Sequence, residues 1–188
     1  KGKEEDEHAR ADRLWDETRG LLLQEKCASK MGEVSEESKA STQLSPLLFD
    51  LTSLQREANG RYGFSAKLTL GLAQALYEKH KVLTYPRTDS RALPEDYIST
   101  VSSTLLMLTG EGVGKGHDEA VLARYAPFAK KILDSHWVIP NKRIFNNAKV
   151  SDHFAIIPTL QAPKHLSEPE SKLYDMVVKR FLAVFYPA

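Results

Sequence analysis

Tyr85 and Arg87 are the residues best suited to chemistry, and they lie two positions apart in the run Lys81–Ser90 (KVLTYPRTDS). Pro86 between them favours an extended chain, in which residues i and i+2 point to the same side. A free tyrosine hydroxyl has a pKa of about 10 and is a weak nucleophile at neutral pH. A neighbouring guanidinium favours the phenolate and binds phosphate through two parallel N–H···O bonds. The pair therefore suits attack on a phosphodiester, which conserves the bond energy in a covalent ester.

A second run, Val150–Thr159 (VSDHFAIIPT), places His153 before an apolar, strand-like stretch. A histidine there can donate to a phosphate oxygen or transfer a proton, and Asp152 can orient it. Both runs also have ordinary interpretations. Pro, Thr, Asp and Ser are turn residues, so Lys81–Ser90 is also typical of a turn. His153 is equally consistent with a structural histidine bonded to nearby backbone, and Asp152 with a turn cap.

Basic and aromatic side chains gather in the sequence around Tyr85. Such a set predicts a groove that follows a nucleic-acid backbone by charge and stacks single-stranded bases on rings. A solvated helix face is the alternative, because charge runs commonly keep a helix in water. The set comprises Arg56, Arg61, Tyr62, Lys79, His80, Lys81, Arg87 and Arg91.

Metal and nucleotide motifs are not found in this sequence. The histidines show no HxH or HExxH spacing, and the single Cys27 excludes a disulfide framework and a Cys-rich zinc site. Gly110–Gly116 resembles a phosphate loop but lacks the Ser or Thr after its lysine, so we expect a flexible loop. The DxD-type acidic pair of a two-metal site is absent after residue 40.

The composition is that of a globular chain with a divided charge. Its 188 residues, 41% of them apolar, suffice for one domain, or for one domain and a piece of another. The net charge of +1 excludes a polycationic nucleic-acid coat but not a local cluster. Residues 1–40 hold 8 basic and 11 acidic residues, while the rest hold 18 and 14. We therefore expect any anion-binding surface after residue 40.

No apolar run approaches the roughly 20 residues that span a bilayer. The charged start, KGKEEDEHAR, does not resemble a secretory signal peptide. We therefore expect a soluble intracellular protein.

The elements that must position these residues are predicted to be mainly helical, with small strands, which is an α+β class. Residues 26–34 and 37–44 alternate loosely and predict a strand pair. Two short helices joined by a Gly-containing turn predict a helix-turn-helix, the first capped by Thr52 with Gln55 and the second by Ser65. The residues between 136 and 150 suggest short extended pieces. The expected helices are 8–24, about 52 to Gly60 or Gly63, 66–81, about 94–108, 119–134 with a break or kink at Pro127, and one from the capping box Ser167–Glu170 to before Pro187.

Three stretches in this order resemble type IA DNA topoisomerases, most closely the bacterial topoisomerase III subgroup. Pro46–Asn59, followed by Gly63–Ala66, resembles the start of that family's tyrosine-bearing domain. Leu83–Ser90 resembles its active-site motif, with Pro86 where topoisomerase III is distinctive, and Asp152–Thr159 resembles its histidine motif. One departure is Phe154, where the family often has Glu or His.

The resemblance implies a role for each matching residue. Tyr85 would be the nucleophile, forming a 5′-phosphotyrosine ester and freeing a 3′-hydroxyl. Arg87 would hold the scissile phosphate and stabilise its transition-state charge, and His153 would hydrogen-bond the phosphate or a flanking nucleotide. Single-stranded DNA is the implied partner, and the further residues expected to contact it are Thr88, Ser90, Arg56 and Lys81.

The resemblance also implies that the chain is a fragment. Residues 1–49 would be part of the arch domain, and residues 50–188 the tyrosine domain with a CAP-like helix-turn-helix. The full-length enzyme would hold Mg²⁺ in a Toprim domain outside this chain, need no ATP, and relax negative supercoils or decatenate DNA in the bacterial cytoplasm at the nucleoid. The fragment alone would be inactive.

Two other classes of protein remain as alternatives. A non-catalytic helix-turn-helix module would bind duplex DNA and use Tyr85 for no chemistry. A nuclease or tyrosine recombinase is less well supported, since the dispersed Arg/His/Arg set of a recombinase is not visible.

Overall fold

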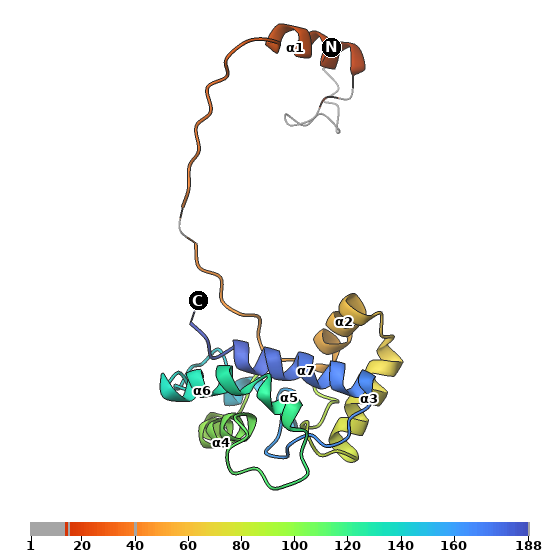
Figure 1. Cartoon of the computed structure of the whole chain (residues 1–188), viewed down its shortest axis with the longest axis vertical. Coiled ribbons are helices and arrows are strands. Elements are labelled where there is room, and N and C mark those ends of the chain that lie inside the picture. Colours follow the sequence, from red (N-terminus) through yellow and green to blue (C-terminus); the bar gives the residue numbers. More distant parts are fainter. Residues whose placement is uncertain (1–13, 15, 40, 188) are drawn as a thin grey trace. The chain divides into compact units, whose positions relative to one another are not determined.

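A computed structural model describes residues 14, 16–39 and 41–187 (Figure 1). The chain divides into two compact units, Lys1–Ser41 and Thr42–Ala188. The arch and tyrosine domains expected at 1–49 and 50–188 stay predictions.

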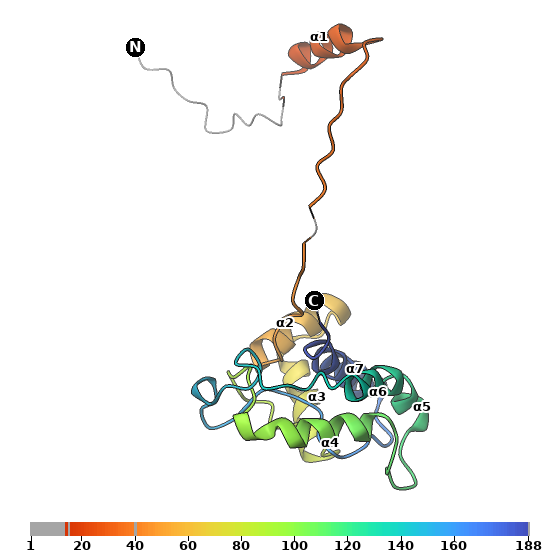
Figure 2. The same cartoon turned by 90° about the vertical axis from the view of Figure 1, so that its left-hand side faces the viewer.

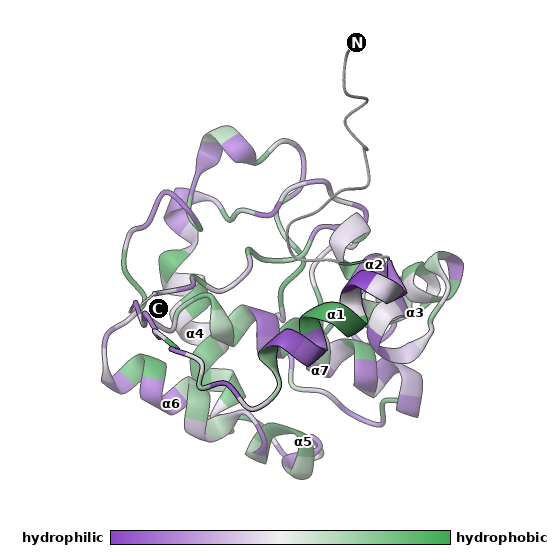
Figure 3. Ribbon diagram, turned by 90° about the horizontal axis from the view of Figure 1, so that it is seen from above, coloured by the Kyte–Doolittle hydropathy of each residue, from purple (hydrophilic) through white to green (hydrophobic). Residues whose placement is uncertain are grey.

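The described residues of the first unit form one helix, α1 (Glu17–Cys27). Asp16 caps it, since the Asp16 carboxylate accepts the Arg19 N–H at 3.2 Å. The helix predicted over 8–24 is thus present from residue 17 and ends later, at Cys27, while most of its predicted first half lies outside the described residues. None of its residues is buried, and in Figure 3 α1 carries both hydrophobic and hydrophilic turns.

The strand pair predicted over 26–34 and 37–44 is wrong. Residues 28–39 are irregular and exposed, and no regular strand occurs among the residues that the structure describes. The physical reason is that an isolated two-stranded pair is unstable without an apolar face to bury. The fold class is therefore mainly α rather than α+β.

The second unit is a helical assembly around its last helix, α7. In chain order the helices are α2 (Leu51–Tyr62), α3 (Ala66–Glu78), the 3-10 turn η1 (Glu95–Tyr97), α4 (Ile98–Leu108), α5 (Glu119–Ala123), α6 (Ala126–Asp134), the 3-10 turn η2 (Asn147–Lys149) and α7 (Glu168–Ala183). Helix α7 contacts the α2–α3 pair on one side and α6 on the other (Figure 1). Helix α6 also contacts α4 (Figure 2).

Most helix boundaries follow the sequence signals. Ser65 caps α3 and the Ser167–Glu170 capping box opens α7, as predicted. Pro127 is the second residue of α6, so the predicted break in 119–134 is confirmed as two helices. The capping box predicted at Thr52 and Gln55 is wrong. The box of α2 joins Asp50 and Ser53, and the Asp50 carboxylate accepts the Ser53 N–H at 2.7 Å.

Helices α2 and α3 form the predicted pair. Gly63 ends α2 with φ at 69°, a left-handed value that favours glycine, and only Gly63, Phe64 and Ser65 separate the two helices. The region 136–150 forms no strand, although Phe145 pairs with Leu93 in a single parallel bridge.

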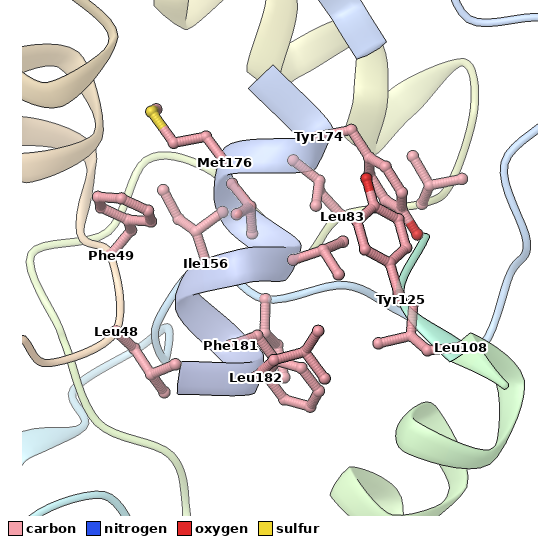
Figure 4. Close-up of a cluster of buried hydrophobic side chains, with 14 of the residues drawn as sticks. Leu48, Phe49, Leu83, Leu108, Tyr125, Ile156, Tyr174, Met176, Phe181 and Leu182 are labelled. Carbon is pink, nitrogen blue, oxygen red and sulfur yellow. The ribbon is translucent and has the colours of Figure 1, made fainter. Parts of the chain in front are cut away.

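The hydrophobic core surrounds α7 (Figure 4). Tyr174 and Phe181 of α7 are fully buried, and Phe49 of the preceding segment is buried with them. Leu83 and Ile156, from the two runs that carry Tyr85 and His153, also project into this cluster. Burial of these side chains anchors both runs to the helical core.

Three arginines hold the lead-in segment (residues 45–49) that precedes α2. Each donates to a different backbone carbonyl of this segment, which forms no regular strand. Arg180 also forms an ion pair with Glu57 and lies 4.1 Å over the Phe49 ring. The pairs are Arg143 with Ser45, Arg180 with Leu47 at 2.9 Å, and Arg91 with Leu48 at 3.1 Å.

Replacing Arg180 by Met should lower the free energy of unfolding by about 2–4 kcal/mol, because Glu57 and the Leu47 carbonyl lose their shared partner in a largely buried place. Arg61→Met is the matched control, since Arg61 also pairs with Glu57, at 2.7 Å, but is 57% exposed. It should cost less than about 1 kcal/mol. Urea denaturation measures both, and equal losses would contradict this role of Arg180.

Candidate active site

The tyrosine segment (residues 82–93) begins where α3 ends abruptly. Lys81 has φ at 60°, a left-handed value that is uncommon outside glycine, and the Val82 N–H donates to the Leu76 carbonyl at 2.9 Å. The predicted helix over 66–81 thus stops at Glu78. The chain then continues outside any helix, with an isolated bridge at Leu83 and a bend at Pro86.

The histidine segment (residues 150–159) lies antiparallel to the tyrosine segment. Leu83 pairs with Pro158, and the Thr84 N–H donates to the Ile157 carbonyl at 3.0 Å. On its other side the Ile156 N–H donates to the Phe49 carbonyl of the lead-in segment at 2.8 Å. The histidine segment therefore lies between the two other segments and fixes their register.

The structure brings the Tyr85 and His153 rings together. Their centroids are 4.2 Å apart, and the rings are tilted by 38°. On α3 Tyr77 meets the Tyr85 ring edge-on at 5.4 Å, and the Lys81 ammonium lies 5.7 Å from the Tyr77 ring. Tyr85 is half-buried and His153 exposed, so the phenol is held in place and remains reachable.

Arg87 is exposed on the same segment as Tyr85. Its one hydrogen bond within the described part of the chain goes from Nη2 to the Gln74 Oε1 at 3.5 Å, near the outer limit for such a bond. It forms no hydrogen bond to Tyr85 or His153 among the described residues. The guanidinium is therefore available to an anion from solution.

The hydroxyls of Thr88 and Ser90 are engaged within the protein. Both residues are buried, and Thr88 Oγ1 donates to the His153 carbonyl at 3.2 Å. Ser90 Oγ donates to the Lys149 carbonyl at 2.7 Å. These bonds hold the tyrosine segment against its neighbours, and DNA contact by the two residues stays a prediction.

The predicted basic set is divided between structural contacts and exposed charge. Arg61 pairs with Glu57, His80 with Glu170, and Arg91 with the Leu48 carbonyl. Arg56 on α2 and Lys81 are exposed. Their contact with DNA stays a prediction, as does the groove.

Glu170 joins the end of α3 to the start of α7. Its carboxylate accepts the Ser167 N–H at 2.8 Å and the Ser167 hydroxyl at 2.7 Å, and it meets His80 Nε2 at 3.2 Å. Burial by itself raises the pKa of the Glu170 carboxyl, but these hydrogen bonds outweigh it and hold the pKa below its usual value. This contact fixes the helix end from which the tyrosine segment departs.

Sequence reasoning missed Tyr77 and Thr84. Tyr77 lies in the last turn of the helix before Tyr85, which is the only signal that could have found it. Phe154, the departure from the family motif, packs against Tyr97 with ring centroids 4.8 Å apart. This position is therefore an aromatic contact in the present chain.

The described residues do not fit a magnesium site. Among them no group of three or more His, Cys, Asp or Glu side chains is placed to hold a metal ion. No helix in the same part of the chain is long and apolar enough to cross a membrane.

Comparison with known proteins places the chain in a family. The family described as DNA topoisomerase matches residues 1–188, and the chain therefore belongs to the type IA DNA topoisomerases. Its relatives are bacterial enzymes named DNA topoisomerase 3. That of Bacillus cereus is 48% identical over 158 residues, which cover 83% of this chain and 20% of the relative. That of Shouchella clausii is 39% identical over 188 residues, which cover 97% and 24%.

The chain spans about a fifth to a quarter of the length of these relatives. Among solved structures, full-length topoisomerase I from Thermotoga maritima matches with a TM-score of 0.51 at 24% identity. The match covers 92% of this chain and 25% of the other. At this identity the likeness to the solved structure concerns the fold alone. The coverage of the relatives shows that the chain is a fragment of a topoisomerase III-like protein.

Glu170→Gln should lower the free energy of unfolding by about 1 kcal/mol at neutral pH, because the cap of α7 is weakened. A carboxyl whose pKa is lowered by folding stabilises above its unfolded pKa and loses that contribution as the pH falls through the folded pKa. The difference from the wild type should therefore shrink on acidification below about pH 4.

Glu168→Gln is the control for this prediction, since Glu168 is an exposed residue of the same first turn, paired with Lys172 at 2.7 Å. It should change stability less than Glu170→Gln at neutral pH. Denaturation of the three proteins across pH measures the effect, and a Glu170→Gln difference that is constant with pH would contradict it.

Proposed function

We propose that this chain is the tyrosine-bearing part of a type IA topoisomerase III that cleaves and rejoins single-stranded DNA. Tyr85 Oη attacks the scissile phosphorus, an O–P bond forms, and the bond from phosphorus to the 3′ oxygen breaks. The phenolic proton is lost and the leaving oxygen becomes a 3′-hydroxyl. Attack by that hydroxyl on the 5′-phosphotyrosine restores the strand, so no ATP is consumed.

The observation that carries this proposal is the placement of the Tyr85 ring. It lies 4.2 Å from the His153 ring, on a segment whose backbone is bonded to the histidine segment. The exposed guanidinium of Arg87 follows two residues later. A nucleophile held in one orientation, with an exposed cation two residues along the same segment, suits in-line attack on a phosphodiester.

Arg87 binds the non-bridging oxygens of the scissile phosphate in this proposal and stabilises the charge that develops on them. His153 donates to the same phosphate or to the adjacent nucleotide. Arg56 and Lys81, both exposed, follow the strand by charge, and Thr88 and Ser90 complete the proposed DNA-contacting set.

The full-length protein in this proposal relaxes negative supercoils and decatenates DNA in the bacterial cytoplasm. Residues 1–49 belong to its arch domain, and residues 50–188 to its tyrosine domain, in which α2 and α3 act as a CAP-like helix-turn-helix. Mg²⁺ is held by acidic residues of another domain, and this chain alone is inactive. The relatives' name, DNA topoisomerase 3, supports this assignment.

Tyr85→Phe in the full-length enzyme should abolish the covalent DNA adduct, since phenylalanine keeps the ring and removes only the hydroxyl. Tyr77→Phe is the matched control, because Tyr77 contacts the Tyr85 ring but is not proposed to react. It should leave the adduct in place. Denaturing gel electrophoresis with a labelled single-stranded oligonucleotide measures the adduct.

An adduct that persists in Tyr85→Phe would remove Tyr85 from its role. No adduct in the wild type, together with a preference for duplex over single-stranded DNA, would favour the helix-turn-helix binding module instead.

Arg87→Ala should slow adduct formation by about 10²–10³-fold, the usual effect of losing one group that stabilises transition-state charge. Arg124→Ala is its control, since Arg124 is also exposed but lies on the turn between α5 and α6. Single-turnover cleavage rates measure both variants, and equal rates would show that Arg87 acts only as general surface charge.

A further inference from the structure

We propose that Thr84 is a positioning residue for the cleavage reaction: its hydroxyl sets the register between the tyrosine segment and the histidine segment, and thereby the distance between the Tyr85 and His153 rings. This inference rests on the proposed function. It assigns Thr84 no contact with DNA.

Thr84 makes three hydrogen bonds, and all of them reach the histidine segment. Its Oγ1 donates to the Ala155 carbonyl at 3.0 Å and accepts the Ile157 N–H at 2.9 Å. Its own N–H donates to the Ile157 carbonyl at 3.0 Å. One side chain thus contacts the backbone of the facing segment at two residues.

These contacts are needed because the facing backbone is buried. Ala155 is 0% and Ile157 is 1% exposed, and only isolated bridges join the segments in this part of the chain. A buried carbonyl or N–H without a hydrogen-bond partner is unfavourable. The Thr84 hydroxyl provides the hydrogen bonds that a neighbouring strand would provide in a regular sheet.

The location of these bonds relates them to the reaction. Thr84 directly precedes Tyr85, and Ala155 follows His153 by two residues. On the far side of Tyr85, Thr88 Oγ1 donates to the His153 carbonyl at 3.2 Å. Along the chain Tyr85 therefore lies between two threonines, Thr84 and Thr88, whose hydroxyls both hydrogen-bond the histidine segment. A shift along this pair of segments would move the two rings apart.

Thr84→Val in the full-length enzyme is the test, because valine keeps the shape and removes the hydroxyl. Single-turnover cleavage should slow by about tenfold to 10²-fold, as a displaced nucleophile predicts. The Kd for single-stranded DNA should stay unchanged. Thr84→Ser restores the hydroxyl and should return the cleavage rate to near that of the wild type.

Thr159→Val is the matched control. Thr159 Oγ1 donates to the Lys81 carbonyl at 2.6 Å, so it joins the end of the histidine segment to the residue that directly precedes the tyrosine segment, remote from His153. Its cleavage rate should stay near that of the wild type. If Thr84→Val does not fold, Thr84→Cys, which keeps a weak donor, should fall between the wild type and the full loss.

Wild-type cleavage by Thr84→Val, or equal slowing in Thr84→Val and Thr159→Val, would overturn the proposal. It would also be overturned if the Kd and the thermal midpoint worsened in step with the rate, because the residue would then be structural only. Wild type and Tyr85→Phe are measured beside these variants. Absence of a Tyr85-dependent adduct in the wild type would identify a failure of the proposed function itself, and with it of this inference.

Discussion

The buried backbone of the histidine segment is the constraint on which the candidate site depends. Ile156 and Ile157 lie in the core, yet no regular strand among the described residues pairs with them. Their hydrogen bonds go instead to Phe49 of the lead-in segment and to Thr84 of the tyrosine segment. Satisfying these groups places two remote parts of the chain on either side of the histidine segment, and the Tyr85 ring beside His153 follows from that arrangement.

The arginines of the second unit fall into two groups, those bonded to backbone carbonyls and those exposed to solvent. Arg91, Arg143 and Arg180 bind backbone carbonyls of the lead-in segment and so hold the chain where it enters the helical core. Arg87 and Arg56, by contrast, are exposed. The net charge of +1 is therefore a poor guide to DNA binding, because several arginines serve the fold and a few exposed cations suffice at one phosphate.

The sequence predicted what depends on local chemistry. Helix starts depend on residues only three or four positions apart. The structure confirms the predicted caps at Ser65 and Ser167, and the helix break near Pro127. The strand pair predicted over 26–34 and 37–44 is wrong because weak alternation without an apolar face does not specify a strand. Residue chemistry made Tyr85 and His153 candidates, and the motif resemblance gave each of them a role. The Thr84 contacts could not be predicted, since they join residues more than 70 positions apart by hydrogen bonds that no local pattern encodes.

If Tyr85 is the nucleophile, a DNA 5′-phosphate becomes linked to its hydroxyl oxygen, and peptide mapping of the trapped adduct locates that linkage. The full-length enzyme would be trapped on single-stranded DNA and digested with trypsin and nuclease, and the nucleotide-bearing peptide would be sequenced by mass spectrometry. We expect the added 5′-nucleotide on the peptide Val82–Arg87, in which Tyr85 is the only tyrosine. A nucleotide on any other peptide, including the one with Tyr77, or linkage through a 3′-phosphate, would contradict it.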